Sequence, residues 1–212
     1  TYGFPLDLTE DVLRESNKRV DIETFDTKMK EQRDKARASW IGSGDESEEK
    51  IWADLRSKED ATEFLGYERE RSQGLITKII KDGKYIEKLS QDEVGVIVMN
   101  QTCFYGESGG QVGDQGQIQG ISGLGKVTDT KRVGQIFVHF VKVQKGYFEV
   151  GNNLEQLLNI DLRLDIKRNH SGTHLVHEAL RRIVGEHVAQ RGSLNNADRL
   201  RFDFSHDKPV TE

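Results

Sequence analysis

Three of the chain's six histidines fall within eight residues, in the stretch Asn169–Glu178. On a helix, where successive residues are rotated by about 100°, His170, His174 and His177 lie within about 60° of one another. Two imidazoles four residues apart can reach one tetrahedral Zn²⁺ from successive helical turns. Solvated histidines on a polar helix face explain the same spacing, and a bare pair of this kind arises often by chance. Both interpretations therefore stay open.

The residues around this stretch limit its chemistry. The second position of the pattern is Ser171, so the general base of an HExxH metalloprotease is missing, and that class is excluded. A zinc site takes three or four protein ligands, whereas the single cysteine, Cys103, lies far upstream in a different element. A metal site built on His170 and His174 is therefore incomplete within this chain, or metal is absent.

Apolar residues predict what the histidine helix packs against. Six of them gather on roughly the side opposite the histidines, and we expect that side to face the core. Gly185 suits the C-terminal end of the helix, because glycine adopts the left-handed conformation there without strain. The histidines are then expected on a polar face. The six apolar residues are Leu175, Val176, Ala179, Leu180, Ile183 and Val184.

Strands are predicted on both sides of this helix. Apolar residues alternate strictly over residues 160–166, which indicates a strand that leads into the helix. Beyond the helix we expect a strand at residues 186–189, a turn at 190–193 and a strand at 200–204. The region 151–212 is thus predicted to form a two-layer α+β unit.

Short β-rich runs separated by glycine fill residues 65–150. Asp82-Gly83 separates two of these runs and suits the type I′ turn of a hairpin. Further strands are predicted at residues 94–99, 126–130 and 135–143. Several short strands at this spacing indicate a small barrel.

Eight glycines fall between Gly106 and Gly125, inside this β-rich region. Such density lets the backbone approach a ligand closely, for example a ribose–phosphate chain, and leaves amide groups able to donate. Tight barrel turns explain the same composition, so the two interpretations stay open. The pattern is neither GxxxxGK[ST] nor a GxGxxG that opens a helix, which argues against a Walker or Rossmann nucleotide site.

Residues 1–42 are predicted to be helical. Asp21 suits the N-cap of a long amphipathic helix, and Asp7 or Thr9 suits the N-cap of a short helix before it. A glycine-bounded acidic break follows, and a short helix is expected around residues 51–55. The fold class is therefore α+β in three parts: helices in residues 1–64, a small Gly-rich barrel in 65–150, and the α+β unit in 151–212.

Composition places the chain among soluble globular proteins. Its 212 residues are 34% apolar and 32% charged, and no apolar run reaches membrane-spanning length. One cysteine excludes a disulfide framework and fits a reducing cytosol. The net charge of −5 is uneven, because residues 1–65 carry a net −6 and residues 161–201 a net +3. The basic surplus around the histidine helix is compatible with phosphate binding and with an ordinary solvated face.

Four stretches, in the right order, resemble alanyl-tRNA synthetase, and the resemblance covers essentially the whole chain. It implies an enzyme that joins alanine to tRNA(Ala) with ATP in an N-terminal catalytic domain and hydrolyses mischarged seryl- or glycyl-tRNA in an editing domain. We expect this chain to be a piece of such a protein, from the end of the tRNA-recognition helices into a truncated editing domain. The stretches are Thr1–Thr9, Glu107–Asp114, Asn169–His177 and Arg201–His206.

The resemblance also implies a metal site. In the family, the Zn²⁺ of the editing domain is held by HxxxH and a later CxxxH, and His170 and His174 match the first pair. The second pair would lie beyond Glu212, which explains the incomplete ligand set. By the same resemblance, Thr173 matches a pocket residue between the ligands and Gln190 the editing-pocket glutamine. ATP would bind only in the catalytic domain that this chain lacks.

The resemblance extends to partners. The Gly-rich segment, with Gly109 and Gly110, is similar to the segment linked to handling of the tRNA 3′ end. The candidates for contact with backbone phosphates are Arg181, Arg182 and Arg191. Expected partners are tRNA(Ala), above all its aminoacylated 3′ end, and no membrane. A homo-oligomer formed through a missing C-terminal region and a cytoplasmic location are further expectations.

Two positions depart from the family pattern, and two other functions compete with the editing function. Cys103 stands where many relatives have proline, and Gly172 where alanine is frequent; neither touches the proposed ligands. A freestanding trans-editing deacylase shares the barrel, the glycines and HxxxH but has no place for helical residues 1–40. A non-catalytic tRNA-binding module would use the glycines and arginines only to clamp phosphates. Deacylation of seryl-tRNA separates the last from an editing enzyme.

Overall fold

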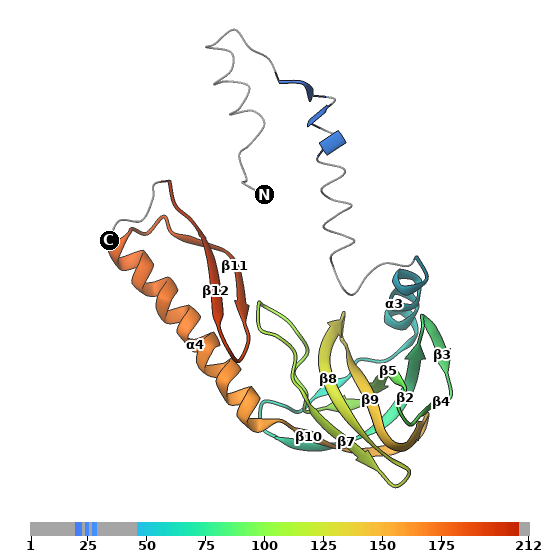
Figure 1. Ribbon diagram of the computed structural model, residues 1–212. Helices are drawn as coiled ribbons and strands as arrows, with labels where there is room; N and C mark the ends of the chain where they lie inside the picture. The colour runs from blue at the N-terminus through green and yellow to red at the C-terminus, as the bar shows by residue number, and fades with distance from the viewer. Residues whose placement is uncertain (1–19, 23, 26, 29–45, 208–212) are drawn as a thin grey trace. The chain divides into compact units, whose positions relative to one another are not determined.

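The computed structural model divides the chain into two compact units, residues 1–50 and residues 51–212 (Figure 1). In the first unit the predicted N-cap at Asp21 is confirmed. The Thr24 backbone N–H donates to Asp21 Oδ1 at 3.0 Å, and the Phe25 N–H donates to the Asp21 carbonyl at 2.9 Å. The cap expected at residue 7 or 9 lies outside the described part of the chain. The described residues are 20–22, 24–25, 27–28 and 46–207.

Six antiparallel strands of the second unit close into the predicted barrel (Figure 1). Each strand pairs with the next around the ring, and the ring is closed because the last strand pairs both with its predecessor and with the first. In ring order the strands are β2 (Arg71–Lys81), β5 (Val94–Met99), β9 (Ile136–Glu149), β8 (Gly123–Val133), β7 (Gly116–Gly120) and β10 (Asn153–Leu158).

Four short strands in the described part of the chain accompany the barrel, two of them paired with barrel strands and two in a separate small sheet. The predicted hairpin is confirmed: Asp82 (φ 50°) and Gly83 (φ 70°) both have positive φ, as a type I′ turn requires, and they connect β2 to β3. A second short strand pairs with β9, and two others pair with each other in parallel. These strands are β3 (Lys84–Ile86), β4 (Lys88–Ser90), β1 (Glu63–Phe64) and β6 (Gln101–Thr102).

Strand β5 is an almost unbroken apolar run because both of its faces are covered. Ile97 and Met99 belong to the cluster that fills the barrel, whereas Val96 and Val98 belong to a second cluster. Helix α3 (Glu46–Lys58) contributes Leu55 to that second cluster, which confirms the short helix expected around residues 51–55. The helix therefore seals one outer face of the barrel.

Helix α4 (Ile160–Ile183) begins where a strand was predicted. The strand predicted from the alternation over residues 160–166 is therefore wrong. A short apolar run of this kind fits a helix as well as a strand. The Asn159 side chain caps the helix by accepting the Leu162 N–H at 3.2 Å, and Asp161 favours the positive end of the helix dipole. The predicted C-terminal glycine is confirmed, since α4 ends just before Gly185, whose φ is +137°.

A hairpin of two antiparallel strands, β11 (Ala189–Asn195) and β12 (Leu200–Ser205), packs against α4 (Figure 1). The strand predicted at residues 200–204 is confirmed. The turn predicted at 190–193 and the strand at 186–189 are wrong, because β11 starts only at Ala189 and runs through that turn. Gly192 belongs to a bulge in β11, where pairing shifts after Gln190.

The compact unit that begins at Ile51 includes residues 51–64, which the sequence analysis grouped with the helical region. It also spans both the barrel and the α4 hairpin part, so residues 65–150 and 151–212 share one unit. As a division into functional domains, the three parts remain a prediction. Within the described residues, no helix combines the length and apolar character that crossing a membrane requires.

Candidate functional site

Helix α4 is fixed to the barrel by an ion pair near the start of the helix. Arg163 Nε lies 2.9 Å from both carboxylate oxygens of Asp114, and Arg163 Nη2 donates to the same carboxylate. The guanidinium also donates to the carbonyls of Gly66 and Cys103, each at 3.0 Å, while Asp114 accepts the Tyr105 N–H at 2.6 Å. The Asp114 side chain is only 2% exposed. This pair therefore sets the position of α4 against the glycine-rich segment.

The glycine-rich segment also contacts β11 directly. The Asn195 N–H donates to the Gly110 carbonyl at 2.7 Å, and the Val112 N–H donates to the Asn195 carbonyl at 3.1 Å. Gly110 has a φ of +83°, and a β-carbon on it would lie 2.6 Å from the Ser193 carbonyl oxygen, so only glycine allows this approach. Gly109 has a φ of +59° and faces open space. Close packing therefore explains Gly110, whereas Gly109 is open to a ligand.

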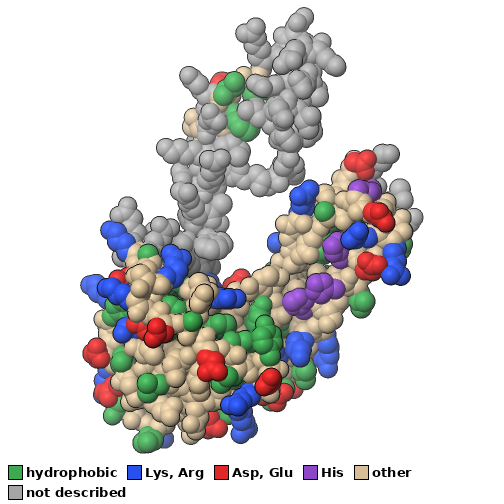
Figure 2. Space-filling model, turned by 180° about the vertical axis from the view of Figure 1, so that it is seen from behind, with side chains coloured by type: hydrophobic (Ala, Val, Ile, Leu, Met, Phe, Trp, Pro, Cys, Tyr) green, Lys and Arg blue, Asp and Glu red, His purple; other side chains and the backbone are tan. Residues whose placement is uncertain are grey.

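His170 and His174 are brought together on one side of α4. Their rings stack at 23° with centroids 5.1 Å apart. Gln111 Oε1, from the glycine-rich segment, lies 2.6 Å from His170 Nδ1. Because an amide oxygen only accepts, His170 Nδ1 donates this hydrogen bond, and Nε2 is not used in it. In Figure 2, histidine side chains (purple) are visible on the part of the molecule that α4 and the residues after it form.

A cavity of about 260 Å³ opens beside His170. It lies at the junction that Arg163 and Gln111 organise, and three aromatic residues of the barrel part form its other side. A polar end with an imidazole and an apolar remainder is the usual composition of a ligand pocket. Its lining includes Phe64, Tyr67, Tyr105, Gln111, Lys167 and His170.

The side of α4 that packs on the hairpin is not the predicted one. Leu175 and Ile183 are 72% and 85% exposed, so the expectation that their side faces the core is wrong for the described residues. The hairpin instead covers the side that carries Thr173 and His177. The His177 ring lies 5.0 Å from that of Phe202, centroid to centroid, and its Nε2 is buried without a hydrogen-bond partner among the described residues. The side of α4 that is in contact with the hairpin thus carries a threonine and a histidine, which the apolar pattern did not single out.

Thr173 and Gln190 lie in different surroundings. Thr173 is 3% exposed, and its hydroxyl hydrogen-bonds to the Asn169 carbonyl at 3.0 Å and to the Asn195 side chain. Gln190 is exposed on β11, and its Nε2 donates to Ser193 Oγ at 3.0 Å. Thr173 thus ties the backbone between the two histidines to β11. Gln190 is linked to the glycine-rich segment through the serine that packs on Gly110.

The three predicted phosphate contacts are exposed side chains. Arg182 Nε lies 2.8 Å from Glu178 Oε1, one helical turn away, and both side chains are more than half exposed. Arg181 neighbours it near the C-terminal end of α4, and Arg191 lies on β11. The structure does not bring these arginines to His170. Their role in tRNA binding remains a prediction.

The donor set at His170 and His174 fits zinc in chemistry, because two imidazole nitrogens on successive turns are ordinary zinc ligands. Among the described residues no third ligand joins this pair. Cys103 is fully buried in the barrel core, and burial raises the pKa of its thiol, so it does not serve as a thiolate ligand here. Gln111 supplies the hydrogen bond that metal-binding histidines usually make through their second nitrogen.

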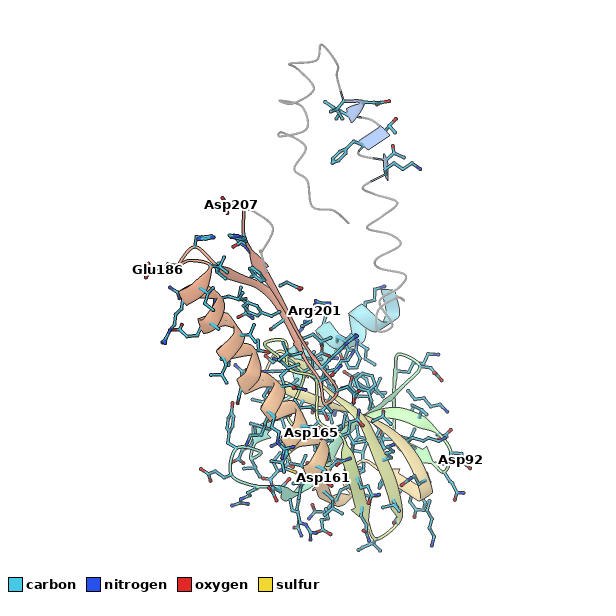
Figure 3. The ribbon with its side chains drawn as sticks, turned by 60° about the vertical axis from the view of Figure 1, so that its left-hand side comes forward. Asp92, Asp161, Asp165, Glu186, Arg201 and Asp207 are labelled. Atoms are coloured by element: carbon cyan, nitrogen blue, oxygen red, sulfur yellow. The ribbon has the colours of Figure 1, made fainter. Side chains whose placement is uncertain are left out.

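A second histidine cluster, which sequence reasoning missed, lies at the other end of the hairpin. His187 Nε2 is 2.7 Å from His206 Nδ1, and Asp207 Oδ1 is 3.4 Å from that same nitrogen. Figure 3 shows Glu186 and Asp207 together at the end of this part that lies away from Asp92 of the barrel. The two histidines are 19 residues apart, so only the pairing of β11 with β12 could reveal them. Gln111 was also missed as a partner of His170, because the two residues are 59 positions apart in the sequence.

Comparison with known proteins places this chain in a family. A family model described as "tRNA synthetases class II (A)" matches residues 1–162. Curated alanine–tRNA ligases from Paracoccus denitrificans, Rhodopseudomonas palustris and Dinoroseobacter shibae are 52%, 51% and 51% identical to the chain. Each match covers 100% of this chain and 24% of the relative. The chain thus spans about a quarter of the length of these relatives.

Because the family model matches well over half of it, the chain belongs to the tRNA synthetases of class II (A). The relatives narrow the likeness within that class to alanine–tRNA ligase. The resemblance to alanyl-tRNA synthetase that four stretches of sequence indicated is therefore confirmed.

Proposed function

We propose that this chain is part of an alanine–tRNA ligase and contributes to the hydrolysis of tRNA(Ala) that wrongly carries serine or glycine. The arrangement at His170 carries the proposal. His174 stacks beside His170, Gln111 of the glycine-rich segment holds one ring nitrogen of His170, and a cavity opens next to it. A helix with merely solvated histidines would need none of these contacts.

A second, hydrolytic site is needed because a pocket that selects alanine can discriminate only weakly against similar amino acids. A pocket for alanine must reject serine, which adds one hydroxyl, and glycine, which lacks one methyl group. Differences of this size give a discrimination of only about 10- to 200-fold. Faithful translation therefore requires that the wrong ester be hydrolysed after it has formed.

The residues of this chain would share that task. Zn²⁺ held by His170 and His174 would supply a Lewis acid beside the aminoacyl ester, with a later CxxxH pair as the remaining ligands. Gln111 keeps His170 Nε2 directed away from its own amide and available to bind. Thr173 fixes the backbone between the two histidines and shapes the pocket. Gln190 supplies a polar group for the serine hydroxyl.

The wider activity belongs to the same proposal. The whole protein would join alanine to tRNA(Ala) with ATP, and ATP would bind outside this chain. Gly109 and the exposed arginines, Arg181, Arg182 and Arg191, would contact the tRNA backbone. We place the protein in the cytoplasm and propose that it forms a homo-oligomer through a C-terminal region.

A second candidate function is a non-catalytic tRNA-binding module. It is favoured by the exposed arginines, Arg181, Arg182 and Arg191, and by Gly109, which faces open space. Such a module would bind the tRNA backbone through its glycines and basic side chains without hydrolysing the ester. The two functions differ in metal content and in turnover.

The test compares this chain with a protein of the relatives' length that contains it. Zinc content and hydrolysis of seryl-tRNA(Ala) are measured for both. We expect stoichiometric zinc and hydrolysis in the longer protein, and we expect replacement of His170 and His174 by alanine to abolish both. Arg168→Ala, which removes an exposed side chain of the same helix, is the control and should change neither. Binding of tRNA by both proteins without hydrolysis by either would establish the binding module instead.

A further inference from the structure

Two cavities in the barrel part share aromatic side chains in their linings. The first, of about 340 Å³, and the second, of about 260 Å³, share Phe64, Tyr67 and Tyr105 as lining residues. Each is close to the lower end of the size range of ligand pockets, about 300 Å³. The second cavity reaches His170. We call these two cavities, together with the aromatic side chains that they share, the aromatic groove.

The rings of the aromatic groove are held in place from below. Phe64 stacks on Phe137 with centroids 5.2 Å apart and an angle of 4°, and the rings of Tyr67 and Tyr105 meet Phe64 edge to face at 4.9 and 6.1 Å. The Tyr105 hydroxyl donates to the Ser108 carbonyl at 3.2 Å. The floor is thus rigid, because each ring is supported by another ring or by a hydrogen bond.

Tyr67 differs from the other rings of the groove in its exposure, because it is 86% exposed although its ring contacts Phe64. An exposed tyrosine ring above an aromatic floor offers a flat apolar face at little cost in side-chain entropy. Single exposed apolar residues are ordinary on protein surfaces, but this one borders both cavities. Its position is that of a ring onto which a planar ligand can stack.

Cationic side chains border both cavities. Arg132 lines the first cavity, and its guanidinium lies 5.9 Å from the centre of the Phe137 ring. Lys167 lines the second and is exposed on α4. Arg163 also lines the second, but its charge is neutralised by Asp114. The groove therefore combines stacking faces with two positive charges, which is the composition of surfaces that bind unpaired nucleic acid.

We propose that the aromatic groove binds an unpaired RNA strand, with bases stacked on Tyr67 and Tyr105 and phosphates near Arg132 and Lys167. The strand would be the 3′ end of the tRNA, led through the groove to His170. The identity of the strand rests on the proposed hydrolytic function, whereas the affinity for unpaired RNA does not. Stacking tolerates any base, since every base has a π-face.

The test measures binding of a fluorescent oligoadenylate to the complete 212-residue chain by anisotropy. Removing one stacking ring weakens single-strand binding by about 5- to 150-fold, so Tyr67→Ala should lower the affinity by that factor. Tyr67→Phe keeps the ring and should bind like the unaltered chain. Tyr85→Ala removes an exposed tyrosine of β3 outside both cavities and should have no effect. Because Tyr67 is so exposed, none of these changes at position 67 threatens the fold.

The proposal would be overturned by equal affinity after Tyr67→Ala, by equal losses for Tyr67→Ala and Tyr67→Phe, or by equal competition by a blunt RNA duplex. Displacement of the oligoadenylate by an apolar peptide that binds more tightly would make the groove a protein-docking surface and also overturn it. Hydrolysis of seryl-tRNA(Ala) by the longer protein is scored separately. A groove that binds RNA in a protein that never hydrolyses the ester refutes only the hydrolytic function. Histidine-dependent hydrolysis with a silent Tyr67→Ala refutes only the groove.

Discussion

Replacing Arg163 by methionine tests whether the buried ion pair holds α4 to the barrel. The substitution keeps the aliphatic stem and removes every guanidinium contact, including those with the carbonyls of Gly66 and Cys103. Asp114, at 2% exposure, is left as a buried carboxylate whose one remaining donor is the Tyr105 N–H. We expect the substitution to lower the free energy of unfolding and also to displace His170, because Arg163 and His170 both lie on α4.

The expected loss follows from the burial of Asp114. Removing one partner of a buried pair costs about 3–5 kcal/mol, a large share of the roughly 5–15 kcal/mol that stabilises a typical domain. Replacing both partners, with Arg163→Met and Asp114→Asn together, should cost less than Arg163→Met alone, because no unpaired charge remains buried. Arg168→Met is the matched control. Its ion pair with Asp165 is 74% and 48% exposed, so its loss should stay below about 1 kcal/mol.

Urea unfolding followed by circular dichroism gives the free energy of unfolding for each variant. A loss of less than about 1 kcal/mol for Arg163→Met would refute the role given to the ion pair. A double variant that is less stable than the single one would refute the explanation through a buried unpaired charge. We expect the free energy of unfolding to fall clearly more for Arg163→Met, at the buried pair, than for Arg168→Met, at the exposed pair.

The remaining predictions concern the barrel. Burial lowers the pKa of His139 to about 4, although the hydrogen bond to the Ile97 carbonyl opposes this shift. The unfolded chain therefore binds more protons between about pH 6.5 and pH 4, so stability should fall by roughly 3 kcal/mol as pH drops through that window. Urea midpoints at several pH values measure this slope, and His139→Gln should remove it; a variant with an unchanged slope would contradict the assignment. Gly113→Ala should cost about 3 kcal/mol by the same assay, because its β-carbon would lie 1.9 Å from the Thr130 carbonyl oxygen, whereas Gly109→Ala should cost only about 1–2 kcal/mol from its positive φ. Equal losses at the two glycines would show that close approach is not what Gly113 provides.

The parts of the fold that local chemistry specifies could be predicted from the sequence. Asp82-Gly83 supplied the positive φ angles of its turn, and Gly185 ended α4, because each depends on a few neighbouring residues. The run over residues 160–166 could not be assigned in this way. Its alternation fits a strand, and only the Asn159 cap and the attachment of Arg163 to Asp114 select the helix.

In the candidate site, too, contacts between residues close in sequence could be predicted, whereas contacts between distant segments could not. His170 and His174 are four residues apart, so their spacing alone predicted that their rings would meet. Gln111 reaches His170 across 59 residues, and Tyr67 reaches the same cavity from another loop, which no local pattern encodes. The side on which α4 packs was also beyond local reasoning. Thr173 faces β11 through a hydrogen bond to the Asn195 side chain, while the more apolar side of the helix stays exposed.

The most direct test of the central proposal is the rate at which a protein of the relatives' length, containing this chain, hydrolyses seryl-tRNA(Ala) before and after His170 and His174 are replaced by alanine. Charging of tRNA(Ala) with alanine is measured in the same samples as a control for folding. We predict that hydrolysis falls to the uncatalysed rate while charging is retained. Unchanged hydrolysis in the double variant would contradict the role of the histidine pair.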